Sequence, residues 1–315
     1  MSEQIETLLK ESRIYPPTAK TIAAAYIKDY ETEYKKSIAD PETFWSDAAK
    51  ELEWFSPWNK VLEWNYPWAK WFVGATCNIA YNCLDRHIKT WRKNKVALIW
   101  VGEQDQERVF TYGELYRQVN RCANALKKLG ITKGDRVTIY LPKVPEQVVA
   151  MLACARIGAI HSVVYSGFSA PALASRIHDA ESKLVITADV GFDRGKVIPL
   201  KSVVDDAMKT CPTVEHVIVV RRQSPGQPLS APKEIDWNDW TKAERATCEA
   251  ERLDAETPLY ILYTSGTTGK PKGVVHVHGG YMVGTYITTK YVFDLKDDDV
   301  YFCVADPGWV TGHSY

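Results

Sequence analysis

The sequence has no long hydrophobic run and no excess of charge of one sign. No segment approaches the roughly 18 consecutive apolar residues of a membrane-spanning helix. The first residues, MSEQIETLLKES, lack the basic end and apolar centre of a secretory signal. Lys plus Arg and Asp plus Glu number 39 each, so no overall field attracts nucleic acid or an anionic membrane. These absences predict a cytoplasmic protein that binds neither nucleic acid nor membrane.

Patterns for metal binding and for disulfides are also missing. The seven cysteines are scattered and include no C-x-x-C pair, so we expect reduced, buried thiols rather than a zinc site or a disulfide framework. His276 and His278 lie two residues apart on an expected strand, where both side chains would face the same side. No third ligand is evident nearby, so we interpret both as structural histidines and expect no metal site.

Tryptophan is concentrated in the first ninety residues, which we expect to be mainly helical. Six tryptophans lie at positions 45, 54, 58, 64, 68 and 71. Asp40 and Pro41 suit the cap and first turn of a helix that continues to about Leu52. So many large rings could form a ligand platform, but aromatic side chains dominate cores and interfaces. We therefore predict that residues 1–90 form a helical, aromatic-rich extension that packs against a neighbouring domain.

From about Val96 onwards, strand and helix patterns alternate. The expected strands cover 96–102, 108–112, 136–141, 159–165, 183–187, 216–220 and 258–264, and the expected helices cover about 112–129, 145–157, 170–180 and 200–208. Thr111 and Glu114 have the spacing of a capping box. Strands this continuously apolar predict an α/β fold with mostly parallel sheets and helices on both faces. The polar segment 223–257 is expected to be an excursion between subdomains.

A segment rich in glycine, hydroxyl groups and lysine directly follows the strand at 258–264. Its glycines let backbone amides approach phosphate oxygens, and its hydroxyls and lysines add donors and positive charge. We predict a phosphate-binding loop made of Thr264, Ser265, Gly266, Thr267, Thr268, Gly269, Lys270, Lys272 and Gly273. It is not the triphosphatase P-loop, because only two residues separate Gly266 from Gly269 and a proline follows Lys270.

The stretch TSGTTGKPKG resembles the signature T-S-G-[ST]-T-G-x-P-K-G of the adenylate-forming superfamily. Residues 110–169 resemble the amino-terminal half of that superfamily's large domain. The aromatic leader and ADPGWVTGHSY (305–315) are similar to acetyl-CoA synthetases in particular. The resemblance implies that 1–90 is the helical extension of such enzymes. It also implies that 91–315 is the amino-terminal part of the AMP-binding domain, with the carboxy-terminal small domain absent.

This resemblance implies an acetate–CoA ligase that converts ATP, acetate and CoA into acetyl-CoA, AMP and pyrophosphate through acetyl-adenylate. A ligase for propionate or another short acyl chain remains open, as does a non-catalytic, truncated homologue that binds nucleotide or CoA. Magnesium is expected to accompany ATP, with its protein ligand and the catalytic lysine outside these residues. We therefore expect the 315-residue chain alone to be catalytically incomplete. The oligomeric state is left open.

The resemblance also assigns residues to two further sites. Trp309, Val310 and Thr311 would form part of the acyl pocket, with Thr311 near the thiol end of CoA. A large ring beside a small side chain leaves room for little more than a methyl group. Asp306 and His313, in the same segment, could be read as an acid–base pair, but the implied chemistry needs none.

The family's basic CoA-binding element, R-x-G-[RK], corresponds to Asp193, Arg194, Gly195 and Lys196. Lys196 occupies the second basic position, whereas Asp193 stands where the first arginine is expected. Arg194, one residue later, is the candidate replacement. The alternative interpretation is an ordinary solvated basic turn.

Overall fold

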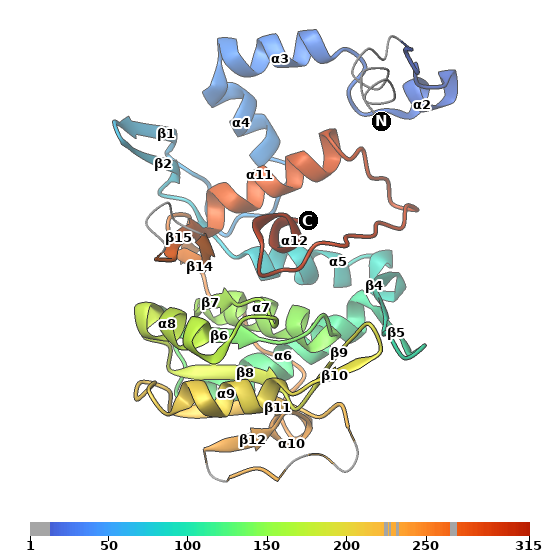
Figure 1. Cartoon of the computed structure of the whole chain (residues 1–315). Coiled ribbons are helices and arrows are strands. Elements are labelled where there is room, and N and C mark those ends of the chain that lie inside the picture. The colour runs from blue at the N-terminus through green and yellow to red at the C-terminus, as the bar shows by residue number, and fades with distance from the viewer. Residues whose placement is uncertain (1–12, 224–225, 227, 231–232, 265–269) are drawn as a thin grey trace, which may run out of the picture.

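A seven-stranded sheet forms the centre of the computed structural model, which describes residues 13–223, 226, 228–230, 233–264 and 270–315. In spatial order its strands are β12 (Glu234–Asp236), β11 (His216–Val220), β8 (Leu184–Ala188), β6 (Arg136–Tyr140), β7 (Ile160–Val163), β14 (Pro258–Thr264) and β15 (Lys272–Val277). Neighbouring strands are parallel, except that β15 runs antiparallel to β14. The predicted mostly parallel sheet is therefore confirmed (Figure 1).

Helices cover both faces of this sheet. They are α6 (Tyr112–Lys128), α7 (Pro145–Ile157), α8 (Ala170–Ala180), α9 (Leu200–Met208) and α10 (Trp237–Lys242). The chain passes from β6 to β7 on one side and then returns across β6 to β8 and on to β11. Because crossovers between parallel strands are right-handed, this change of direction places α7 on one face of the sheet and α8 and α9 on the other. Helix α6 packs against α7 and against α10, and α8 packs against α9. The fold class expected from the sequence is thus the observed one.

Helix α6 begins and ends as its sequence dictates. The Glu114 amide donates to the Thr111 hydroxyl at 3.2 Å, and the Glu114 carboxylate accepts from the Thr111 amide at 2.8 Å, which completes the predicted capping box. Its inward stripe, including Val119 and Leu126, is fully buried. The helix is followed by Gly130 at φ +79°, a conformation that glycine adopts without steric cost.

The segment 223–257 belongs to the main domain, so its interpretation as an excursion between subdomains is wrong. Its strand β12 pairs in parallel with β11 at the edge of the sheet. Its helix α10 packs on α6 and buries Trp237 and Trp240. These two indoles anchor the segment, because burying large aromatic side chains is strongly favourable.

The amino-terminal region contains helices and a hairpin. Its helices are α2 (Ala19–Ala24), α3 (Tyr30–Ala39), α4 (Pro41–Ala49), the π-helix η1 (Tyr81–Asp85), α5 (Arg86–Ile88) and the 3-10 helix η2 (Trp91–Asn94). Strands β1 (Lys60–Asn65) and β2 (Trp68–Val73) form an antiparallel hairpin that a purely helical prediction misses, and β3 (Thr76–Cys77) pairs with β13 (Leu253–Asp254).

Most of the clustered tryptophans pack against the rest of the protein, as predicted. Trp45, Trp54, Trp58 and Trp71 pack against a core shared with α11 (His278–Tyr291), to which Met282 contributes. Trp64 and Trp68, near the tip of the β1–β2 hairpin, are instead 64% and 74% exposed. Packing therefore accounts for four of the six rings.

Two hairpins and a short helix complete the described structure. Strands β4 (Val96–Val101) and β5 (Glu107–Thr111), both expected from the sequence, form an antiparallel hairpin, and β9 (Gly191–Asp193) pairs with β10 (Lys196–Ile198) in a second one. Helix α12 (Val310–Ser314) follows an irregular segment after α11. Within the described ranges, no helix combines the length and the apolar character needed to cross a membrane.

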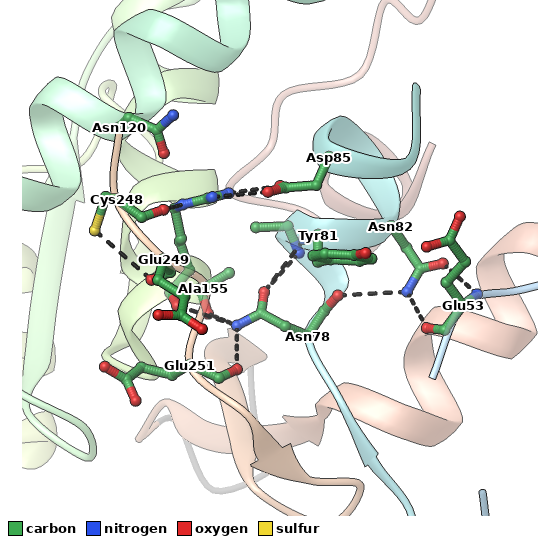
Figure 2. Close-up of polar contacts among 12 residues, drawn as sticks. Glu53, Asn78, Tyr81, Asn82, Asp85, Asn120, Ala155, Cys248, Glu249 and Glu251 are labelled. Carbon is green, nitrogen blue, oxygen red and sulfur yellow. Dashed lines mark hydrogen bonds and ion pairs between the residues drawn. The ribbon is translucent and has the colours of Figure 1, made fainter. Parts of the chain in front are cut away.

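Buried polar contacts join the amino-terminal region to the sheet domain. The Asn78 side-chain amide donates to the backbone oxygens of Ala155 at 3.1 Å and Glu251 at 3.0 Å. Its carbonyl oxygen accepts from the amide of Ala80 at 2.9 Å. Figure 2 shows that these contacts bring η1, the end of α7 and the chain after α10 together. The two regions are therefore held by directional bonds as well as by apolar packing.

Candidate active site

The candidate site lies along one edge of the main sheet. Parallel strands present their carboxyl ends on the same edge, where α/β folds bind ligands. The groups found there, in their order across the sheet, are Arg222 after β11, the β9–β10 hairpin after β8, Lys143 after β6, Tyr165 after β7 and Thr264 at the end of β14. Topology thus gathers segments that are far apart in the sequence.

The predicted phosphate loop connects β14 to β15. Thr264 is exposed at the end of β14, and its partner in the ladder is the exposed Lys272. Lys270 is also exposed, beside the loop. A side chain at Gly273 would meet Ile261 at 3.0 Å, so glycine allows the close approach of the two strands. The remaining predicted loop residues lie outside the described residues: Ser265, Gly266, Thr267, Thr268 and Gly269.

A small cavity of about 40 Å³ lies beside the end of β14. It is lined by Val163, Val164, Tyr165, Phe168, Arg176, Tyr263, Gly308 and Trp309. The Trp309 ring contacts Phe168 edge-on, with centroids 6.5 Å apart. Val310 and Thr311 begin α12, are exposed and do not line this cavity. Of the three residues predicted for the acyl pocket, Trp309 alone lines this cavity.

Sequence reasoning did not identify Arg176, which borders the same cavity. Its guanidinium lies over the ring of Phe168, 4.5 Å from the centroid, and it is 9% exposed. Burial lowers its pKa from the usual arginine value. Tyr263 donates to the Asp179 carboxylate at 2.7 Å, and burial raises the pKa of its phenol. The sequence feature that could have identified Arg176 is its position in the helix expected at 170–180, directly after a strand of the main sheet.

The predicted basic element forms a tight, exposed hairpin. Arg194 and Gly195 occupy its turn with φ of +51° and +75°, and Asp193 pairs with Lys196 across the strands. Two consecutive residues with positive φ are typical of a type I′ turn, which favours glycine. The Gly195 amide donates to the Glu103 carboxylate at 2.5 Å and so links this turn to the β4–β5 hairpin. Arg194 and Lys196 are both exposed, as a surface cation site requires.

The histidines and Asp306 have separate structural contacts. The Asp306 carboxylate accepts from the Gly308 amide at 2.8 Å, and burial raises its pKa. His313 shares a hydrogen bond with His161 at 2.9 Å between their Nε2 atoms. No hydrogen bond or ion pair joins Asp306 to His313 in the part of the chain that the structure describes.

Two further histidines, His276 and His278, also have structural surroundings. His276 stacks on Tyr260 with ring centroids 4.5 Å apart, whereas His278 is buried at the start of α11. The described residues contain no group of three or more His, Cys, Asp or Glu side chains placed to hold a metal ion.

Comparisons with known proteins match the whole chain. Residues 84–315 match the model of the AMP-binding enzyme family, and residues 30–83 match that of the acetyl-coenzyme A synthetase N-terminus. The chain is 51% identical over 319 residues to acetyl-coenzyme A synthetase of Deinococcus radiodurans, covering 100% of this chain and 49% of that protein. It is 51% identical over 317 residues to the Gemmatimonas aurantiaca protein of the same name, with coverage of 99% and 48%.

A solved structure gives the same picture. Acetoacetyl-CoA synthetase from Streptomyces lividans superposes with a TM-score of 0.85 at 31% identity, over 94% of this chain and 45% of that chain. The resemblance and the fold class expected from the sequence are therefore confirmed. The chain spans about half the length of the curated relatives it matches.

Proposed function

We propose that this chain, which belongs to the AMP-binding enzyme family, supplies the amino-terminal part of an acetate–CoA ligase. The proposed reaction joins acetate to CoA at the expense of ATP, through acetyl-adenylate, and releases AMP and pyrophosphate. Adenylation is needed because the oxygen of a free carboxylate is a poor leaving group, whereas AMP leaves readily when the CoA thiol attacks. The proposed substrates are available in the cytoplasm, which is the location we propose.

One observation supports this proposal above the others: the phosphate loop and the small cavity meet at the end of β14. Thr264 precedes the loop, and its neighbour Tyr263 lines the cavity together with Trp309. A carboxylate held with its methyl group in this cavity would lie beside phosphates held by the loop. Placing the two reactants side by side is the main requirement for attack of the carboxylate on the α-phosphate, with pyrophosphate as the leaving group.

The proposed roles follow from the chemistry of each side chain. Thr264, Lys270 and Lys272, with the loop between them, would hold the β- and γ-phosphates and offset the charge that develops during transfer. Trp309 would limit the length of the acyl group. Arg194 and Lys196 would bind phosphates of CoA. Magnesium would arrive with ATP, and we assign no ligand for it among these residues.

Exchange of labelled pyrophosphate into ATP tests the first half-reaction. In a protein of the relatives' length that contains this chain, the exchange should depend on acetate. Lys272→Gln should lower kcat/KM for ATP by about 10- to 100-fold, the value of one hydrogen bond to a charged group. Lys209→Gln, which removes an exposed lysine at the end of α9 paired with Asp206, should leave the exchange unchanged.

The other candidate activities predict different results. Exchange that responds to propionate rather than acetate would establish a different acyl substrate. Binding of ATP or CoA without any exchange would establish a non-catalytic homologue. Residues 1–315 expressed alone are expected to bind nucleotide weakly and to give no exchange. Equal exchange by wild type and Lys272→Gln would overturn the role assigned to Lys272.

A further inference from the structure

Arg222 lies next to the β9–β10 hairpin although 26 residues separate it from Lys196 in the sequence. It follows β11, and the hairpin follows the neighbouring parallel strand β8. The Arg222 amide donates to the Asp189 carboxylate at 2.8 Å, which fixes its backbone against the start of the hairpin. The residue is therefore held at the same edge of the sheet as Arg194 and Lys196.

Two aromatic rings flank the guanidinium of Arg222. Its central carbon lies 4.8 Å from the ring centroid of Phe192, in β9, and 5.7 Å from that of Trp100, in β4. The Trp100 ring is itself fixed, because its N–H donates to the Lys143 carbonyl at 2.7 Å. Aromatic rings attract the face of a guanidinium and leave the N–H groups in its plane available to an anion.

No carboxylate among the described residues pairs with the charge of Arg222. Among the described residues, its guanidinium forms no ion pair and no hydrogen bond, although it is half-buried. Two carboxylates lie near enough to influence it, and both are already engaged. Glu146 is paired with Arg108 at 2.6 Å, and Asp189 accepts from three backbone amides, including that of Arg222.

The preceding residue, Arg221, lies at the same edge of the sheet and is paired with a carboxylate. Its Nε lies 3.3 Å from the Asp236 carboxylate in β12. The two adjacent arginines thus differ in their surroundings. Arg221 has an acidic partner on the neighbouring strand, whereas Arg222 lies beside the hairpin without a carboxylate partner among the described residues. A partly desolvated cation is costly unless an anion accompanies it. A bound ligand would supply that anion.

We propose that Arg222 binds the 3′-phosphate of CoA, together with Arg194 and Lys196. This inference rests on the proposed function, which makes CoA a substrate. Asp193 occupies the position where the related element carries its first arginine, so an acidic residue offsets one of the hairpin's two cations, Arg194 and Lys196. Arg222 makes up this deficit from the neighbouring strand. A fixed guanidinium suits a phosphate dianion because its N–H groups match two oxygens at once.

CoA and dephospho-CoA, which differ only in the 3′-phosphate, provide the test. Their affinities for a protein of the relatives' length that contains this chain, and for its Arg222→Gln variant, are measured by calorimetry at low salt. Wild type should prefer CoA by about 10- to 100-fold. Arg222→Gln should lose this preference through weaker binding of CoA, while its affinity for dephospho-CoA stays unchanged. Unchanged binding of dephospho-CoA also shows that the variant is folded.

Two variants serve as controls. Arg221→Gln removes the same charge one residue away and should keep the preference for CoA. Arg222→Lys keeps the charge but not the planar donor pattern, and should retain part of the preference. The inference is wrong if Arg222→Gln keeps the wild-type preference for CoA, or if its affinities for CoA and dephospho-CoA fall by the same factor. Either result leaves the proposed function unaffected. Wild type that binds neither ligand overturns the inference together with the CoA site of the proposed function.

Discussion

Arg156 and Asp85 form a buried ion pair with two parallel hydrogen bonds. Nη1 of Arg156 lies 2.7 Å from Oδ2 of Asp85, and Nη2 lies 2.8 Å from Oδ1. The Arg156 side chain is 1% exposed, and its Nε also donates to the Cys248 carbonyl at 2.6 Å. One guanidinium therefore joins η1, the end of α7 and the chain after α10. Figure 2 labels its two partners, Asp85 and Cys248.

Removing the carboxylate should destabilise the protein strongly. Asp85→Ala leaves the Arg156 charge buried without its counter-ion, and such a loss costs about 3–5 kcal/mol in the free energy of unfolding. Urea unfolding of wild type and variant at pH 7 measures this change in the free energy of unfolding. The double variant Arg156→Met with Asp85→Leu should recover much of the loss, because an apolar pair of similar size carries no desolvation cost.

An exposed ion pair gives the matched control. Lys209 and Asp206 lie 2.7 Å apart at the end of α9, and both side chains are more than 60% exposed. Asp206→Asn should change the unfolding free energy very little, because water screens such pairs. If Asp85→Ala cost no more than Asp206→Asn, the buried pair would not hold the two regions together.

Local elements of this fold are predictable from the sequence because their signals are local. Helix α7 begins at Pro145 and ends at Ile157, where Gly158 adopts φ +73°. Proline in the first turn and glycine after the last are start and stop signals that the sequence alone displays. The capping box of α6 and the limits of β14 are predictable for the same reason.

Contacts between distant segments are not predictable in this way. Asp85 and Arg156 are 71 residues apart, and nothing in either neighbourhood specifies the other. The same holds for Arg222 and Phe192, which meet because β11 lies beside β8. Strand order is set by packing of the whole domain. The limits of the strand before the proposed phosphate loop could thus be predicted from local residues, whereas the aromatic setting of Arg222 could not.

Buried histidines should make the protein sensitive to mild acid. Burial lowers the pKa of His278 and of His313 to about 3, and that of His161 well below its usual value. An unfolded histidine has a pKa of about 6.5. Between these values the unfolded chain binds more protons than the folded one, so stability should fall as pH drops below about 6.5. The unfolding free energy, measured at several pH values from 7.5 to 5, gives the slope of stability against pH.

Replacing one of these histidines should flatten that slope. His278→Gln removes one titrating group, so the slope should decrease by up to about 1.4 kcal/mol per pH unit. Lys209→Gln removes an exposed charge at the end of α9 and should leave the slope as it is, because lysine does not titrate between pH 7.5 and 5. A wild-type stability that stays constant from pH 7 to 5 would contradict the burial of neutral histidines.

The size of the acyl group should depend on Trp309. Its ring borders a cavity of about 40 Å³, so Trp309→Ala would extend this space toward solvent. In a protein of the relatives' length, we expect kcat/KM to fall for acetate and to rise for butyrate. One methylene in an apolar pocket changes selectivity by about 10- to 200-fold. Trp68→Ala, at a ring that is 74% exposed on the β1–β2 hairpin, is the matched control and should keep the preference for acetate. Because the cavity lies at the end of β14, selectivity unchanged by Trp309→Ala would place the acyl group elsewhere along the edge of the sheet.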